Sequence, residues 1–115
     1  MIYSYIFEPK AVQEYEDAIS WYLERSETAA RKFEAELNSK LAKVCANPEL
    51  YPIVKKSFRE TSINHYPYSI IFFLDDKTQA IIIVSIFHNK RNPKTKIQRI
   101  KWATASLFFS DAVFL

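Results

Sequence analysis

The 115-residue chain contains no glycine at all. Glycine alone enters the left-handed backbone region without a steric penalty from Cβ, so tight hairpin turns must use other residues, and Asp or Asn are the expected ones. The same absence removes the glycine-rich loops that cradle nucleotide phosphates. The sequence therefore excludes the dinucleotide-binding and P-loop classes of nucleotide-binding protein.

Cysteine and histidine are nearly as scarce, with one cysteine and two histidines in the whole chain. Cys45, His65 and His88 do not have the ligand spacing of a structural or catalytic zinc site. A single cysteine also cannot form an internal disulfide. We expect no metal and no other cofactor, and we expect Cys45, which falls near an apolar helical stripe, to be a buried packing residue.

Long apolar runs are missing as well. The longest runs, residues 70–74 and 80–87, fall far short of the roughly 20 residues that a membrane-spanning helix needs. The N-terminal stretch lacks the basic and apolar regions of an export signal. The length suits one domain. These observations predict a soluble cytoplasmic protein with no membrane partner.

What the chain does have is an uneven distribution of charge. Residues 8–36 hold eight acids and four bases, a balance of −4, so the rest of the chain carries +7 toward the total of +3. No acid lies between His88 and Ser110, and that stretch is rich in lysine and arginine. Such segregation suits an anionic partner, either nucleic acid or an acidic protein segment. The alternative is a solvated basic face.

The first half of the chain shows one strand and two helices. Residues 2–7 are β-branched and aromatic, which predicts a strand. Apolar residues then recur at spacings of 3 and 4, which predicts a helix over about 10–24 and a second helix that Ser26 or Thr28 caps. The second helix ends at Asn47-Pro48. The short connector between the two helices predicts an antiparallel helical hairpin.

Aromatic residues are prominent on these two helices. Tyr15, Trp21, Tyr22 and Phe33 all fall at core spacing. An aromatic cluster in a protein with a basic segment can also be a platform on which nucleic-acid bases stack. The helical spacing favours packing in the core over base stacking for all four.

The second half of the chain has the alternating pattern of strands. Residues 57–63, 66–74 and 79–88 are strand-like, and residues 75–78 form the turn between the last two. The element order predicts an α+β fold, with an N-terminal strand and an antiparallel helical hairpin packed on a mostly antiparallel four-stranded sheet.

Several short motifs in this order resemble those of the RelE/ParE toxin superfamily. They include a Trp-Tyr pair on the first helix, an arginine on the next strand, a Tyr-Pro-Tyr segment and a terminal His-x-x-Arg-x-Pro, which here are Trp21-Tyr22, Arg59, Tyr66-Pro67-Tyr68 and His88 to Pro93. The resemblance covers residues 1–93, which we take as the toxin domain. Residues 94–115 form a C-terminal extension, and because residues 107–109 and 112–115 are strongly apolar, we expect it to pack on the core, a second subunit or a partner.

The resemblance implies the toxin of a type II toxin–antitoxin system, of the kind called plasmid stabilisation proteins, held inactive by a cognate antitoxin. RelE-like members cleave messenger RNA on the ribosome by attack of a 2′-hydroxyl on the neighbouring phosphate, without a metal ion. ParE-like members poison DNA gyrase by binding it. A third possibility is a non-toxic binding module on the same scaffold, and the sequence leaves a homodimer open.

The candidate site residues follow from the resemblance and from the chemistry. As a nuclease, the chain would use His88, Arg91 and Arg59 as catalytic groups, because RNA cleavage needs proton transfer and cations that offset phosphate charge. The residues expected to bind the target or its phosphates are Lys55, Lys56, Arg59, Lys90 and Arg91.

Each candidate also has a plain structural alternative. Arg59 can form an ion pair with Glu60 or with an acid on a helix, and the two lysines can be ordinary solvated charges. His65 is expected to be a hydrogen-bonded structural residue.

One departure from the RelE-like pattern bears on the target. RelE-like nucleases carry a tyrosine shortly after the motif arginine, whereas no tyrosine follows Tyr68 in this chain. Whether the chain is an enzyme is thus left open, and gyrase is placed slightly ahead of the ribosome as the target.

Overall fold

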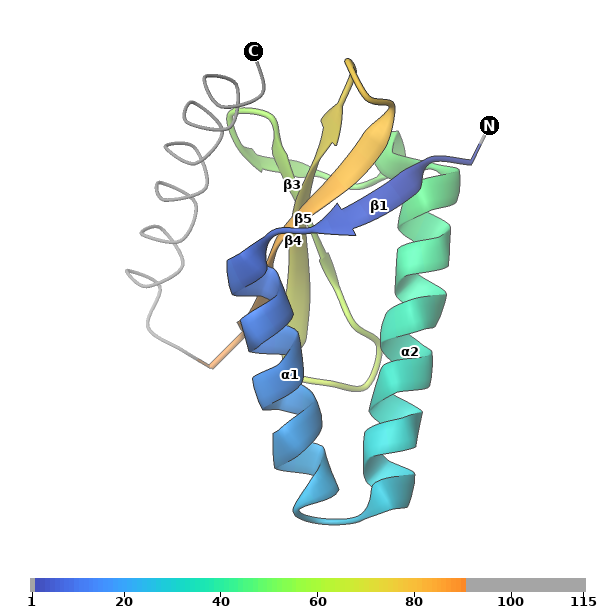
Figure 1. The fold of residues 1–115 in the computed structure, drawn as a ribbon. Coiled ribbons are helices and arrows are strands. Elements are labelled where there is room, and N and C mark those ends of the chain that lie inside the picture. The colour runs from blue at the N-terminus through green and yellow to red at the C-terminus, as the bar shows by residue number, and fades with distance from the viewer. Residues whose placement is uncertain (1, 91–115) are drawn as a thin grey trace.

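The computed structural model describes residues 2–90, and its elements confirm the expected α+β class (Figure 1). In chain order they are β1 (Ser4–Phe7), α1 (Pro9–Leu23), α2 (Glu27–Ala46), a single 3-10 turn η1 (Pro48–Leu50), β2 (Ile53–Lys55), β3 (Phe58–Ser62), β4 (Tyr68–Asp75) and β5 (Ala80–His88). The predicted Arg91 and the predicted extension 94–115 lie outside the described residues.

Over the described residues the sheet has five strands, one more than the sequence predicts, in the order β1-β5-β4-β3-β2. The additional strand, β2, has three residues and follows Pro52, too short to produce an alternating pattern. β1 runs parallel to β5, and the other neighbouring pairs are antiparallel. The mostly antiparallel character of the sheet is therefore as expected, with β1 brought to the far side of β5.

The two helices form the predicted hairpin and run side by side in Figure 1. Pro9 occupies the first turn of α1, where its missing N–H costs nothing. The Oγ of Ser26 accepts a hydrogen bond from the N–H of Ala29 at 2.9 Å, so Ser26, not Thr28, is the cap of α2. α2 ends at Ala46, as the Asn47-Pro48 pair predicts.

The core lies between the helices and one face of the sheet. Its helical part comes from apolar residues at spacings of 3 and 4 on α2, which are Ala30, Phe33, Leu37, Leu41 and Val44. These residues pack against alternate side chains of β4 and β5. The strand residues are Ile70 and Phe72 on β4 and Ile81 and Ile83 on β5. α1 contributes two small residues, Ala11 and Ala18, which let the helix approach β5 closely.

The turn residues with positive φ are not the Asp or Asn residues that the sequence predicts. In the described residues, Lys56, His65 and Gln79 have positive φ, at 52°, 70° and 55°. The expectation that Asp or Asn would hold these positions was wrong. Asp75, the last residue of β4, stabilises the β4–β5 turn instead, because its carboxylate accepts hydrogen bonds from the N–H of Lys77 and the hydroxyl of Thr78.

Candidate target-binding groove

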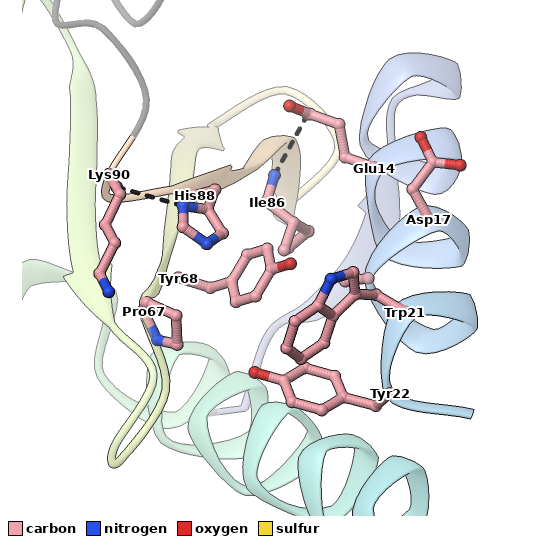
Figure 2. A pocket seen from close by; sticks show the side chains of 10 residues that line it. Glu14, Asp17, Trp21, Tyr22, Pro67, Tyr68, Ile86, His88 and Lys90 are labelled. Atoms are coloured by element: carbon pink, nitrogen blue, oxygen red, sulfur yellow. Dashed lines mark hydrogen bonds between the residues drawn. The ribbon is translucent and has the colours of Figure 1, made fainter. Parts of the chain in front are cut away.

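A hollow lies between α1 and the neighbouring ends of β4 and β5 (Figure 2). Its volume is about 490 Å³. Acidic and aromatic residues of α1 form one wall. The other wall comes from the paired ends of β4 and β5, from Pro67 just before β4 and from Lys90 just after β5. The lining residues are Glu14, Asp17, Ala18, Trp21, Tyr22, Pro67, Tyr68, Ile86, His88 and Lys90.

Glu14 joins the two walls at the inner end of the groove. Its Oε1 accepts a hydrogen bond from the hydroxyl of Ser85 at 2.9 Å and another from the N–H of Ile86 at 3.3 Å. β1 pairs with β5 only as far as Ile83, so the edge of β5 beyond that point needs another acceptor. Glu14 thus supplies the hydrogen-bond acceptor that a neighbouring strand would otherwise supply to the open edge of β5.

Glu14 is not among the residues that the sequence predicts for the site, although its position in the helix carries a signal. Glu14 lies three residues after Ala11 and four before Ala18, both of which are buried. A carboxylate at that spacing falls on the buried stripe of an amphipathic helix, where an ionised group needs a hydrogen-bonding partner. An acid inside an apolar stripe therefore marks a contact with another element.

The aromatic part of the helical wall divides into buried and exposed members. Phe33 is fully buried and stacks on Tyr22 with a ring separation of 4.9 Å, which confirms packing for these two. Trp21, in contrast, is 46% exposed, so its assignment to the core was wrong. The guanidinium of Arg25 lies 3.2 Å from the Trp21 ring centroid and also donates to the Trp21 carbonyl, covering one face of the indole.

Two tyrosines of α1, Tyr15 and Tyr22, are held in their neutral form. Burial, then the neighbouring Tyr68 and Tyr66, raise the pKa of Tyr22 above its ordinary value. Burial and a hydrogen bond from the Tyr15 hydroxyl to Glu34 raise the pKa of Tyr15. Tyr22 therefore offers the groove a phenol that can donate a hydrogen bond, and not a phenolate base.

The sheet wall brings together two of the predicted site residues. The imidazole of His88 packs edge-on against Tyr68, with ring centroids 4.9 Å apart, and its Nδ1 accepts a hydrogen bond from the N–H of Lys90 at 3.2 Å. The Lys90 side chain is exposed beside it, as Figure 2 shows. The groove therefore places an imidazole and an ammonium opposite the carboxylates of Glu14 and Asp17.

Arg59 does not belong to this groove. Its Nη1 donates to the carbonyl oxygen of Tyr51 at 2.6 Å and, more weakly, to that of Glu49 at 3.5 Å. Within residues 2–90, the partners of the guanidinium are therefore backbone carbonyls in and after η1, and no ion pair with the acidic side chains that the sequence suggested is found there. This contact ties β3 to the segment that leads into β2.

The register of the sheet separates Arg59 from His88. Arg59 pairs with Phe72 on β4, whereas His88 pairs with Tyr68, four residues away on the same strand. At about 3.3 Å per residue, the two levels differ by about 13 Å along the strand. The whole of β4 also separates their own strands. Within residues 2–90, the predicted catalytic pair of Arg59 and His88 is not brought together.

The remaining predicted lysines lie near the start of β3, away from the groove. Lys55 ends β2, and Lys56 occupies the turn that follows, both with exposed side chains. In the sheet register, this turn lies beside the first half of β5, whereas Lys90 comes after the last residue of β5, so the turn and Lys90 lie toward opposite ends of that strand. His65, expected to be hydrogen-bonded and at the opening of a strand, is exposed in the turn before β4, which begins only at Tyr68.

Cys45 is buried in the core, as expected, and burial raises the pKa of its thiol. No group of three or more His, Cys, Asp or Glu residues that could hold a metal ion occurs in the part of the chain that the structure describes. Over the same residues, no helix has both the length and the apolar character to cross a membrane.

Solved structures share this fold. An arginine-to-alanine double mutant of the E. coli toxin RelE in the free state matches with a TM-score of 0.64 at 15% identity, covering 88% of this chain and 97% of that chain. Isolated E. coli RelE matches at 0.55 and 17% identity, covering 85% and 98% of the two chains. The intact E. coli RelBE toxin–antitoxin complex matches at 0.54 and 17% identity, covering 77% of this chain and 99% of that chain.

At such low identity these likenesses establish the RelE-like fold alone, which is the class of protein that the architecture defines. A search of curated proteins finds no match. The family assignment comes from residues 5–93, which match the model of the ParE toxin of type II toxin–antitoxin systems, parDE. The chain therefore belongs to the ParE toxin family, within the RelE/ParE superfamily.

Proposed function

We propose that this toxin stops growth by binding an essential target, with DNA gyrase as that target, and that a cognate antitoxin neutralises it. The observation that carries the proposal is the match of residues 5–93 to the ParE toxin family. The separation of Arg59 from His88 adds to it, because it weighs against Arg59 as the phosphate-binding partner of His88 in RNA cleavage. RNA cleavage through the 2′-hydroxyl needs a proton acceptor and a phosphate-binding cation around one phosphodiester group. About 13 Å along β4 is more than one such group spans.

The state of Arg59 supports the same proposal. A guanidinium clamps a phosphate with two parallel N–H groups that face the ligand. Arg59 already donates through Nη1 to two backbone carbonyls, and these bonds hold the guanidinium against the segment that leads into β2. Its contribution is better understood as structural, because it fixes the segment between η1 and β3.

The groove beside α1 is suited to binding a protein surface. Its walls carry the carboxylates of Glu14 and Asp17 on one side and the Lys90 ammonium on the other, around the exposed ring of Trp21. Tryptophan is enriched among the residues that contribute most to protein–protein affinity. We propose that this groove is part of the surface that contacts the target.

A growth experiment tests the toxin and antitoxin parts of the proposal. Inducing the chain alone in bacteria is expected to stop growth, and inducing the neighbouring reading frame together with it is expected to restore growth. Normal growth with soluble toxin detected on a blot would contradict the proposal and favour a non-toxic binding module.

Mapping the ends of transcripts in the arrested cells separates the two toxin mechanisms. The proposal expects no new cut sites in messenger RNA when the chain is induced. New cuts in phase with codons would instead identify a ribosome-dependent endoribonuclease of the RelE kind, with His88 and the arginines as catalytic groups. A His88→Ala variant is the matched control, because it should abolish the cuts in that case alone.

A further inference from the structure

The sheet has a second apolar face, opposite the helices. Its side chains come from the three central strands, and the buried members are between 0% and 7% exposed. They are Phe58, Ile71, Phe73, Val84 and Phe87, with Ile82 partly buried against them. Both faces of β4 and β5 are therefore apolar, which is typical of strands covered on both sides and not of a sheet that faces water.

Neither described helix covers this second face. Side chains alternate along a strand, and the helices pack with the other set, represented by Ile70 and Phe72 on β4. A single layer of strands cannot remove several phenylalanine rings from water by itself. Removing each such ring from water stabilises the fold, so a covering element is needed for the face to be stable.

The path of the chain after β5 leads toward this face. The hydroxyl of Ser69 donates a hydrogen bond to Oδ1 of Asn89 at 2.6 Å. Ser69 pairs with Phe87 in the β4–β5 register and shares its side of the sheet by alternation with Ile71. The N–H of Asn89 also donates to the Pro67 carbonyl at 2.8 Å. Asn89 is thus anchored beside the second face, and the chain continues from there.

We propose that residues 94–115 of the same molecule cover the second apolar face. The segment begins a few residues after the anchored Asn89, and it contains enough large apolar side chains for the task, which are Ile97, Ile100, Trp102, Leu107, Phe108, Phe109, Val113, Phe114 and Leu115. A tethered segment is present at an effective concentration in the millimolar range. The chain's own segment therefore outcompetes a second copy at ordinary protein concentrations.

Photo-cross-linking of the full chain tests the proposal. The photoreactive residue p-benzoylphenylalanine is placed at Phe73, on the second face, and irradiated protein is digested and analysed by mass spectrometry. The main product is expected at the mass of one chain, with the cross-link ending in residues 94–115. Placement at Ile82, which is only partly buried on the same face, gives a second reading if the first variant does not fold.

A matched control uses the same group at Leu50, which is 74% exposed on η1. That variant is expected to give far less cross-linking to residues 94–115. Three results would overturn the proposal. They are a main product at twice the chain mass, cross-links that avoid residues 94–115 at both face positions, and equal cross-linking to the segment from Leu50.

Discussion

Replacing Glu14 by alanine is expected to destabilise the domain more than any other change to an acidic residue of α1. The carboxylate accepts hydrogen bonds from the Ser85 hydroxyl and the Ile86 N–H, and both of those residues are about 1% exposed. A hydrogen bond to a charged group contributes about 1.5–3 kcal/mol. Glu14 itself is only half-buried, so water entering the groove would replace part of the lost acceptor. The expected loss is therefore about 2–3 kcal/mol, below the sum of the two bonds.

Urea denaturation followed by circular dichroism measures this loss. In a domain of this size it corresponds to a fall in Tm of about 10 °C. Glu14→Gln keeps an oxygen acceptor and is expected to lose less than half as much. The matched control is Glu16→Ala, because Glu16 is an exposed acid on the same helix, and its effect should stay within about 0.5 kcal/mol. Equal losses for Glu14→Ala and Glu16→Ala would refute the assigned role of Glu14.

Four further predictions concern other residues. The pKa of Tyr22 is raised in the folded state, so the folded protein keeps the phenol proton to a higher pH than the unfolded chain does. The free energy of unfolding is therefore unaffected below pH 10.0 and falls as the pH rises above it. In melting curves, Tyr22→Phe should lose less stability at alkaline pH than the parent protein. Cys45 should react with a thiol reagent only at the rate of unfolding, because it is buried with a raised pKa, and fast reaction in native buffer would contradict this. Arg59→Ala should cost about 1–3 kcal/mol in urea denaturation by removing the donor of two backbone carbonyls, and unchanged stability would reopen a role for Arg59 in phosphate binding. Arg91→Ala should lower toxicity in the growth assay more than Lys94→Ala, since only Arg91 belongs to the His-x-x-Arg-x-Pro motif, and equal effects in two folded variants would indicate diffuse electrostatics.

The architecture was largely predictable because its signals are local. Helical spacing on α2 and alternation on β4 and β5 each repeat over several residues, and both follow directly from backbone geometry. β2 escaped prediction because three residues carry no periodicity. Its position depends on pairing with β3, which is a tertiary contact and leaves no pattern of its own.

The candidate site was less predictable, since it depends on which elements meet. The sequence grouped Arg59 with His88 by chemical type, and the register then placed them at different levels of the sheet. Trp21 fits the helical stripe by spacing, yet α1 approaches β5 through Ala11 and Ala18 and leaves the indole outside. Small residues set the line of closest contact, so large neighbours at the margin of a stripe remain exposed.

The most direct test of the proposed function is a cleavage-complex assay with purified gyrase. Supercoiled plasmid is incubated with gyrase, ATP and the toxin, and the reaction is then stopped with detergent and protease. We predict linear plasmid that depends on the toxin and disappears when the antitoxin is added first. Plasmid that stays supercoiled at toxin concentrations that halt a purified translation reaction would contradict it.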